Sequence, residues 1–187
     1  MEKRIYAPLT EDMVRKLKSG DSVLLSGVIY TARDAAHKRL VELINNGDEL
    51  PLDIKNEIIY YVGPTPAKPG QVIGSAGPTT SYRMDPYAPI LLDNGLKGMI
   101  GKGARGVEVI DSIKKNKAIY FASIGGAAAL TSKCIVMSEL VAYEDLGAEA
   151  IRRLEVKDLP LVVVIDYEGN NLYEIGQKQY LSTVSNK

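Results

Sequence analysis

Cysteine and histidine each occur only once in this chain of 187 residues, as Cys134 and His37. A single cysteine cannot form an internal disulfide, so a reducing compartment is the simplest environment. Structural metal sites and iron–sulfur clusters need several cysteine or histidine ligands. The chain therefore cannot build such a centre from these two side chains, and we expect no metal site in it.

Net charge and long apolar stretches are also missing. The 23 basic residues are balanced by 23 acidic ones, which gives no electrostatic reason to expect nucleic acid or an anionic membrane as a partner. No run of about 18 apolar residues is present to cross a bilayer. The polar start of the chain does not resemble a signal peptide. We expect a cytoplasmic protein.

What remains is the composition of an ordinary globular protein, with 45% hydrophobic and 25% charged residues. A chain of this length can bury a sizeable core and is typical of one domain. We therefore treat residues 1–187 as a single domain.

Apolar segments with strand character alternate along the chain with segments of helical spacing. Strands are predicted at residues 21–30, 58–62, 71–76, 98–101, 118–122 and 161–165. Helices are predicted at residues 9–20, 32–46, 84–94 and 107–116, with a helical turn at 127–131. Residues 135–143 and 150–156 fit a strand or another extended segment, and the tail from Tyr173 gives a weak, polar pattern. This alternation predicts an α/β domain with a mixed sheet.

Small residues and cations gather in three loops that follow predicted strands. The segments are TARDAAH at residues 31–37, GSAGPTTSYRMD at 74–85 and GKGARG at 101–106. Glycine-rich loops at strand ends are common anion-binding elements in α/β proteins. Three cationic loops in a chain without net charge indicate a pocket for a small anionic molecule.

The side chains in these loops suit a dicarboxylic acid. Arginine matches a carboxylate with two parallel hydrogen bonds, so Arg33 and Arg83 could each hold one carboxylate. Lys102 is a point charge between two glycines, where the backbone can approach a ligand closely. Thr79 and Thr80 offer hydroxyls for hydrogen bonding or proton transfer.

Residue type alone leaves alternatives open for each of these side chains. Arg33 and Lys102 could instead form surface ion pairs, and the GKG segment does not match the phosphate loop of nucleotide-binding proteins. His37 could make a structural hydrogen bond near the start of a helix or take part in catalysis. Cys134 could be a small core residue or a nucleophile, and Tyr82 could contact a ligand or simply pack.

Five motifs, taken in order, resemble the β subunit, or C-terminal domain, of class I iron–sulfur fumarases and the related L-tartrate dehydratases. The resemblance runs from residue 23 to residue 166. It rests on TARDAAH at residues 31–37, GPTTSYRMD at 77–85, GKG at 101–103, SIGG at 123–126 and EDLGAEA at 144–150.

The resemblance implies a swivelling β/β/α domain that closes over a partner α subunit. In the family the α subunit holds a [4Fe–4S] cluster on three cysteines, and the open iron acts as a Lewis acid on the substrate. By resemblance Arg33, Arg83 and Lys102 bind the substrate carboxylates. Thr79 stands at the position proposed in the family as a base, assisted by an acidic residue of the partner, with Thr80 as a substitute.

The expected function is therefore that of the β subunit of a two-subunit fumarate hydratase, a hydro-lyase active only with its α subunit. It would interconvert fumarate and (S)-malate within a hetero-oligomer. Two alternatives stay open: the β subunit of an L-tartrate dehydratase, and a non-catalytic module that binds an anion and regulates a partner. The segments RDAA, RMD and SIGG are closer to the fumarase pattern.

Overall fold

The protein is described by a computed structural model that covers residues 2–123 and 128–185. Its strands are β1 (Lys3–Ala7), β2 (Ser22–Thr31), β3 (Ile58–Tyr60), β4 (Gly98–Gly101), β5 (Ile119–Ser123), β6 (Ile135–Ala142) and β7 (Ile151–Ile165). Its α-helices are α1 (Glu11–Arg15), α2 (Asp34–Asn46), α3 (Ala88–Asp93), α4 (Val107–Asn116), α5 (Ala128–Cys134) and α6 (Leu172–Ser185). Two short 3-10 helices are η1 (Ser81–Met84) and η2 (Glu144–Glu149).

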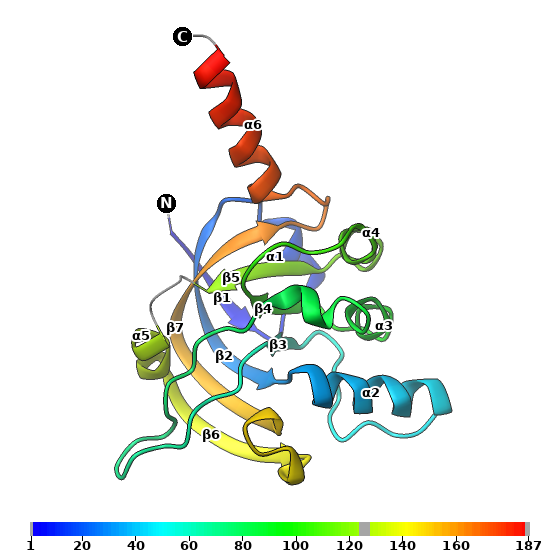
Figure 1. Ribbon diagram of the computed structural model, residues 1–187, viewed down its shortest axis with the longest axis vertical. Coiled ribbons are helices and arrows are strands. Elements are labelled where there is room, and N and C mark those ends of the chain that lie inside the picture. The colour runs from blue at the N-terminus through cyan, green and yellow to red at the C-terminus, as the bar shows by residue number, and fades with distance from the viewer. Residues whose placement is uncertain (1, 124–127, 186–187) are drawn as a thin grey trace.

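The strands form one mixed sheet in the order β1-β2-β3-β4-β5-β7-β6, so the predicted α/β class with a mixed sheet is confirmed. Strands β2, β3, β4 and β5 are mutually parallel, whereas β7 runs antiparallel to its neighbours. A further pairing between β2 and β7 closes the strands β2, β3, β4, β5 and β7 into a ring. Figure 1 shows β7 curving through the whole body of the molecule.

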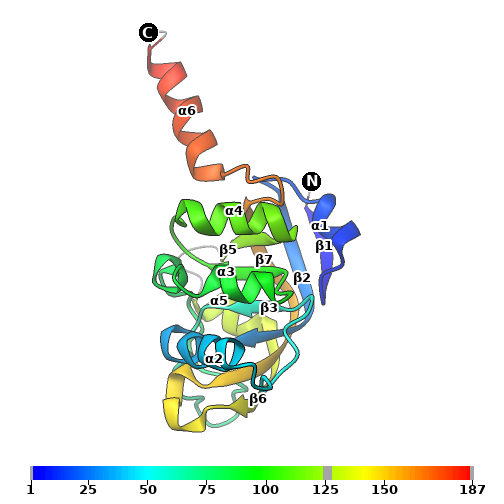
Figure 2. The same cartoon turned by 90° about the vertical axis from the view of Figure 1, so that its right-hand side faces the viewer.

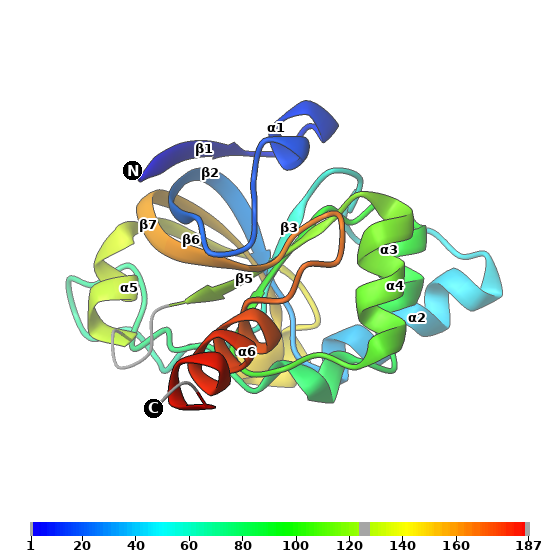
Figure 3. The ribbon, with the colours of Figure 1, turned by 90° about the horizontal axis from the view of Figure 1, so that it is seen from above.

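Alternating side chains divide the core into two layers. Ile58 and Tyr60 of β3 pack inside the ring, while Ile59 of the same strand and Tyr61 after it pack on the outer side. This alternation is the period of two that a strand imposes on its side chains. Helices α2, α3 and α4 cover the outer layer, and Figure 2 shows them lying one above another on that side. Figure 3 shows α5 on the opposite side of the sheet.

One end of α1 and one end of α2 follow the local chemistry. The Thr10 hydroxyl accepts a hydrogen bond from the Met13 backbone N–H at 3.3 Å and caps α1. Helix α2 ends at Gly47, whose φ of 75° lies in the left-handed region that glycine adopts without strain. Within helix α2, Ala36 and Leu40 are buried against the sheet.

The strand predicted at residues 71–76 is wrong. This segment folds back on Thr65, because the Ser75 N–H donates to the Thr65 hydroxyl at 2.8 Å and the Thr65 N–H donates to the Ser75 carbonyl at 3.1 Å. A Cβ on Gly74 would overlap the Thr65 carbonyl oxygen, so the two segments lie in close contact. The apolar residues Val72 and Ile73 therefore belong to a loop and not to the sheet.

Several other predictions are revised, and the helix predicted at residues 84–94 is regular only over Ala88–Asp93. Helix α1 ends at Arg15, before the predicted end at residue 20. The two extended segments at residues 150–156 and 161–165 join into the single 15-residue strand β7. The weakly patterned tail forms helix α6, which projects away from the body in Figure 1.

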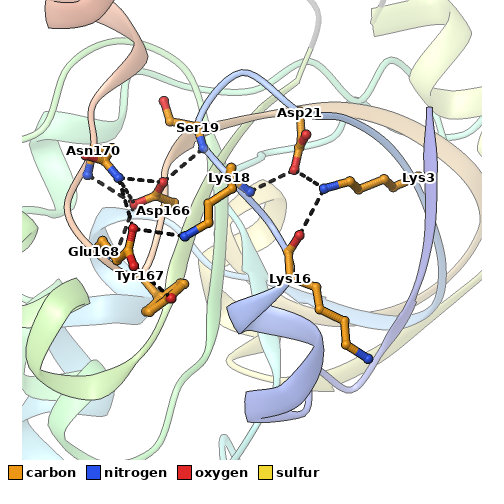
Figure 4. Close-up of polar contacts among 9 residues, drawn as sticks. All are labelled: Lys3, Lys16, Lys18, Ser19, Asp21, Asp166, Tyr167, Glu168 and Asn170. Carbon is orange, nitrogen blue, oxygen red and sulfur yellow. Dashed lines mark hydrogen bonds and ion pairs between the residues drawn. The ribbon is translucent and has the colours of Figure 1, made fainter. Parts of the chain in front are cut away.

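A polar cluster ties the start of β2 to the end of β7. Figure 4 shows Asp166 accepting the Ser19 backbone N–H at 3.1 Å, while the neighbouring Lys18 pairs with Glu168 at 2.9 Å. Asp166 is almost fully buried and also accepts three hydrogen bonds from Asn170. The cluster lies at the amino end of β2 and so occupies the edge of the sheet away from Arg33.

Candidate functional site

The predicted anion-binding loops meet at one edge of the sheet. Because β2, β3, β4 and β5 are parallel, their carboxyl ends share that edge. Arg33 follows β2, Gly63 follows β3, Lys102 follows β4 and Ser123 ends β5. Ligands of α/β sheets commonly bind at such an edge.

The segment with the two threonines lies across the ends of β3 and β4. The Thr79 N–H donates to the Tyr61 carbonyl at 2.7 Å, and Thr80 forms a parallel bridge with Lys102. Thr79, Thr80 and Lys102 are therefore brought together, as a single pocket formed by the cationic loops requires. The Lys102 side chain is exposed and forms no ion pair with any described residue.

Arg33 stands immediately before α2, with its guanidinium group packed over Gly63. A Cβ at Gly63 would lie 2.7 Å from Arg33 Nη1, so a side chain there would displace the guanidinium group. Arg33 Nη2 lies 3.3 Å from Glu149 Oε1 and 3.7 Å from Asp34 Oδ2. The Nε atom of Arg33 is buried and has no hydrogen-bond partner in the described structure.

Glu149 supplies the helix cap that Arg33 cannot. Its Oε2 atom accepts the backbone N–H of Ala35 at 3.0 Å, in the first turn of α2. One turn earlier in η2, Asp145 pairs with Arg39 of α2, with Oδ1 2.9 Å from Nη1. These two carboxylates explain the EDLGAEA motif, because they fasten η2 to the helix that follows Arg33.

Arg83 is held by Asp34 in a bidentate pair. Its Nε donates to Oδ1 at 2.8 Å and its Nη2 donates to Oδ2 at 2.7 Å. Arg33 and Arg83 thus share the carboxylate of Asp34. The three predicted cations face two carboxylates, so one net positive charge remains at the site.

Arg105 is a buried cation that the sequence prediction missed. Its side chain is fully buried and donates to Asp85 Oδ1 at 2.7 Å. The guanidinium carbon lies 5.4 Å from the ring centre of Tyr61 and 5.0 Å from that of Tyr120, within range of cation–π attraction. The only sequence signal was that Asp85 ends one of the cationic segments and Arg105 is the last residue but one of another.

His37 has a structural contact of the kind predicted for the start of a helix. Its Nδ1 atom lies 2.9 Å from the Arg33 carbonyl oxygen, and its ring meets the edge of Tyr61 at 5.2 Å between centres. Complete burial lowers the pKa of His37 to about 4, so the imidazole is neutral at pH 7. Since a carbonyl can only accept, the proton of the neutral ring sits on Nδ1.

The remaining candidates contribute less to this edge. Tyr82 is 63% exposed. Cys134 packs beside the inner core with its sulfur 3.8 Å from the Asp158 carbonyl oxygen, and burial raises the pKa of its thiol. Ser123 has a buried hydroxyl with no partner in the described structure. The glycines predicted after Ser123 lie outside the described residues.

A cavity of about 480 Å³ lies beside this edge, under the loop that follows Gly63. It is lined by Pro64, Ala148 and Arg152 among others, but by none of the five predicted site residues. Arg83 is 41% exposed and Lys102 is exposed as well. As far as the described residues go, the cationic edge is therefore open.

Residues 2–123 and 128–185 contain neither a metal-binding group nor a membrane-spanning helix. None of their His, Cys, Asp and Glu side chains form a group of three or more that could hold a metal ion. Among the helices in these ranges, none combines the length and apolar character needed to cross a membrane.

Comparison with known proteins finds one matching family model and several similar proteins. A family model described as Fumarase C-terminus matches residues 2–176. The chain is 38% identical to a putative fumarate hydratase class I of Geobacillus stearothermophilus over 186 residues, which cover 97% of this chain and 35% of that protein. It is 44% identical to the anaerobic fumarate hydratase class I of Escherichia coli strain K12 over 152 residues, or 80% of this chain and 28% of that protein.

A third relative is close to this chain in length. A putative L(+)-tartrate dehydratase subunit beta of Methanocaldococcus jannaschii is 38% identical over 182 residues, covering 94% of this chain and 93% of that protein. The chain thus spans about a third or less of the two fumarate hydratases but nearly all of the tartrate dehydratase subunit.

Proposed function

Because this chain belongs to the fumarase C-terminal family, we propose that it is the β subunit of a class I fumarate hydratase. It supplies carboxylate-binding and proton-transfer groups for the reversible hydration of fumarate to (S)-malate. The observation that carries the proposal is the convergence of Arg33, Arg83 and Lys102 with two threonines at one open edge of the sheet.

In this proposal the two arginines bind the two carboxylates of the substrate. Arg83 uses its Nε and one N–H of Nη2 to hold Asp34, which leaves Nη1 and the second N–H of Nη2 for a ligand. Arg33 lies over Gly63, and its buried Nε has no partner among the described residues. Lys102 adds a positive charge on the neighbouring strand end.

Dehydration of (S)-malate removes a proton from C3 and hydroxide from C2. We assign the proton transfer to Thr79, with Lys102 favouring the negative charge that develops on the reacting groups. A threonine hydroxyl is a weak base by itself, so it requires a neighbouring base, which we assign to an acidic residue of the partner. Thr80 is the substitute for Thr79, because its backbone lies against Lys102.

The residues of this chain do not fit an iron–sulfur cluster. Its single cysteine contacts the Asp158 carbonyl and packs beside the inner core. We therefore propose that a [4Fe–4S] cluster belongs to an α subunit that covers the open edge, where its iron supplies a Lewis acid for the substrate hydroxyl. The near-complete match to a separate β subunit supports a hetero-oligomer.

The experiment is to co-express the chain with a cysteine-bearing partner and to follow malate dehydration under anaerobic conditions. Arg33→Ala, Arg83→Ala and Lys102→Ala should each lower kcat/KM by roughly 10- to 100-fold, since each removes a charge-assisted hydrogen bond. Arg4→Ala is the matched control, because Arg4 forms an exposed pair with Asp158 away from this edge. Near wild-type kcat/KM in all three site variants would contradict the proposal.

The second candidate is the β subunit of an L-tartrate dehydratase. It is favoured by one observation, the 93% coverage of the M. jannaschii subunit by this chain. Both candidates use the same cationic edge, so their substrates must be compared on one preparation. A complex that binds dicarboxylates without turning either substrate over would instead favour a regulatory anion-binding module.

A further inference from the structure

One buried residue connects the two segments that carry the candidate site. The Ser81 backbone N–H donates to the Lys102 carbonyl at 2.9 Å, and the Lys102 backbone N–H donates to the Ser81 hydroxyl oxygen at 3.0 Å. Ser81 is completely buried. The segment with Thr79, Thr80 and Arg83 is therefore bonded to the Lys102 loop in both directions through a single serine.

The direction of the next hydrogen bonds follows from donor counting. The Tyr120 hydroxyl lies 2.9 Å from the Ser81 hydroxyl and 2.9 Å from the Gly103 carbonyl oxygen. A carbonyl can only accept, so the single proton of Tyr120 goes to Gly103. Ser81 must then donate its own proton to the Tyr120 oxygen.

These bonds form one directed chain that starts and ends on the Lys102 loop. It runs from the Lys102 N–H to Ser81, from Ser81 to Tyr120, and from Tyr120 to the Gly103 carbonyl. Every hydroxyl in it both donates and accepts, and bonds in such chains strengthen one another. Burial raises the pKa of Tyr120, which keeps its donor proton in place at neutral pH.

The two glycines beside Lys102 make room for this arrangement. A Cβ on Gly101 would overlap the Ser81 hydroxyl oxygen, so a side chain there would expel the serine. Gly103 has a φ of 86°, in the left-handed region where glycine is favoured. The GKG motif is therefore explained by close packing of Gly101 against Ser81 and by the left-handed backbone of Gly103, without any phosphate-binding loop.

Asp85 fixes the far end of the same loop. It accepts the Gly106 backbone N–H at 2.7 Å and pairs with the buried Arg105. The Lys102 loop is thus anchored at both ends to the η1 segment, while the Lys102 side chain itself stays exposed. Only the backbone of Lys102 is held by these bonds, so the place of its amine depends on the position of the loop.

We propose that Ser81 and Tyr120 are positioning residues, which hold Lys102 and the threonine segment at the separation that a dicarboxylate requires. The proposal rests on the proposed function for the identity of the substrate, but the hydrogen-bond chain exists in this subunit alone. Neither hydroxyl needs to touch the substrate, because both act through the backbone of the Lys102 loop.

The first test uses the isolated chain and amide hydrogen exchange by NMR. Ser81→Ala removes the acceptor of the Lys102 N–H, so exchange of that amide should accelerate by roughly three- to tenfold. Ser26→Ala is the matched control, because the Ser26 hydroxyl accepts the Asp158 N–H at 2.9 Å. The control should accelerate exchange at Asp158 and leave Lys102 unchanged. An unchanged Lys102 amide in Ser81→Ala would overturn the proposal.

The second test uses the complex with the partner subunit. Tyr120→Phe keeps the ring and removes the hydroxyl, so it provides a fold-preserving variant beside Ser81→Ala. Each should lower kcat/KM for malate by roughly 3- to 30-fold, and by much less in a Lys102→Ala background, because they act through that lysine. Tyr167→Phe, which loses a bond to the exposed Glu168, is the control.

The outcomes separate the two proposals. Equal losses with and without Lys102 would assign Ser81 and Tyr120 to general stability and overturn the positioning role. An inactive wild-type complex would count against the proposed function, while faster Lys102 exchange in Ser81→Ala would still support the fastening of the loop.

Discussion

His37 makes the stability of this chain sensitive to mildly acidic pH. Its pKa is about 4 in the fold and about 6.5 in an unfolded chain, so between these values only the unfolded state binds the proton. The contribution of His37 to the free energy of unfolding is therefore fully present above pH 6.5 and is lost as the pH drops toward 4. The loss between pH 7 and pH 5 should be about 2 kcal/mol.

Urea unfolding at pH 7 and pH 5 measures this contribution. His37→Gln removes the titrating group and should show a smaller loss between the two pH values, whatever its stability at pH 7. Burial opposes the shift, but bonds from Lys3 and Lys18 together lower the pKa of Asp21, so the contribution of Asp21 is lost only at lower pH. Equal losses in the wild type and in His37→Gln would contradict the assignment.

Thr79 should affect chemistry more than binding. Its backbone N–H is fixed by the Tyr61 carbonyl, so Thr79→Val should keep the segment in place while removing the hydroxyl. A role in proton transfer predicts a lower kcat with little change in KM for malate. Thr80→Val is the comparison, and a larger loss of kcat in that variant would move the role to Thr80.

The residue scale also marks the limit of what the sequence could predict. Arg33, Arg83 and Lys102 stand out because their loops contain small residues. Asp34 and Glu149 do not, since their importance depends on contacts between segments that are distant in sequence. Ser81 was part of a recognised motif, but its role depends on Tyr120, which only folding brings near.

At the scale of elements, the local sequence pattern predicts a helix or strand correctly where tertiary contacts favour the same structure. Helix α4 and strand β4 have the predicted bounds, because glycine or asparagine ends an apolar periodic run in each. Residues 71–76 have strand-like composition but bond to Thr65, so tertiary contacts override propensity there. Helix α6 was missed because its apolar residues do not follow one clear stripe.

The cluster around Asp166 should determine how firmly the ends of β2 and β7 are joined. Asp166→Ala removes the charged acceptor of partly buried hydrogen bonds from Ser19 and Asn170, and bonds to a charged group typically contribute about 1.5–3 kcal/mol. Glu168→Ala is the control, because Glu168 and Lys18 are about half exposed and such surface pairs contribute little to stability. Urea unfolding of the isolated chain compares them.

The cluster lies at the edge of the sheet away from Arg33. The kcat/KM of the reconstituted complex should therefore stay near the wild-type value in Asp166→Ala below its melting temperature. A large loss of activity in a folded Asp166→Ala complex would show that the two edges are coupled.

At the scale of the whole molecule, the preference between substrates is the sharpest question. L-tartrate carries one more hydroxyl than malate, and a site built for malate would leave it poorly paired. An unpaired buried polar group costs about 1–3 kcal/mol, so kcat/KM should favour malate by about tenfold or more. Both substrates must be compared on the same cluster-replete preparation. A tartrate preference would support the dehydratase alternative and leave the cationic edge unchanged.

The parallel course of β1 and β2 has a consequence for gene fusion. Lys3 pairs with Val23 near the amino end of β2, whereas Arg33 follows its carboxyl end. At about 3.3 Å per residue, the two ends are roughly 30 Å apart along the strand. A domain fused ahead of Lys3 therefore enters at the far edge, and a tether of about ten extended residues would let it reach the cationic edge. The same fold can thus serve as a separate subunit or as the C-terminal part of a longer chain.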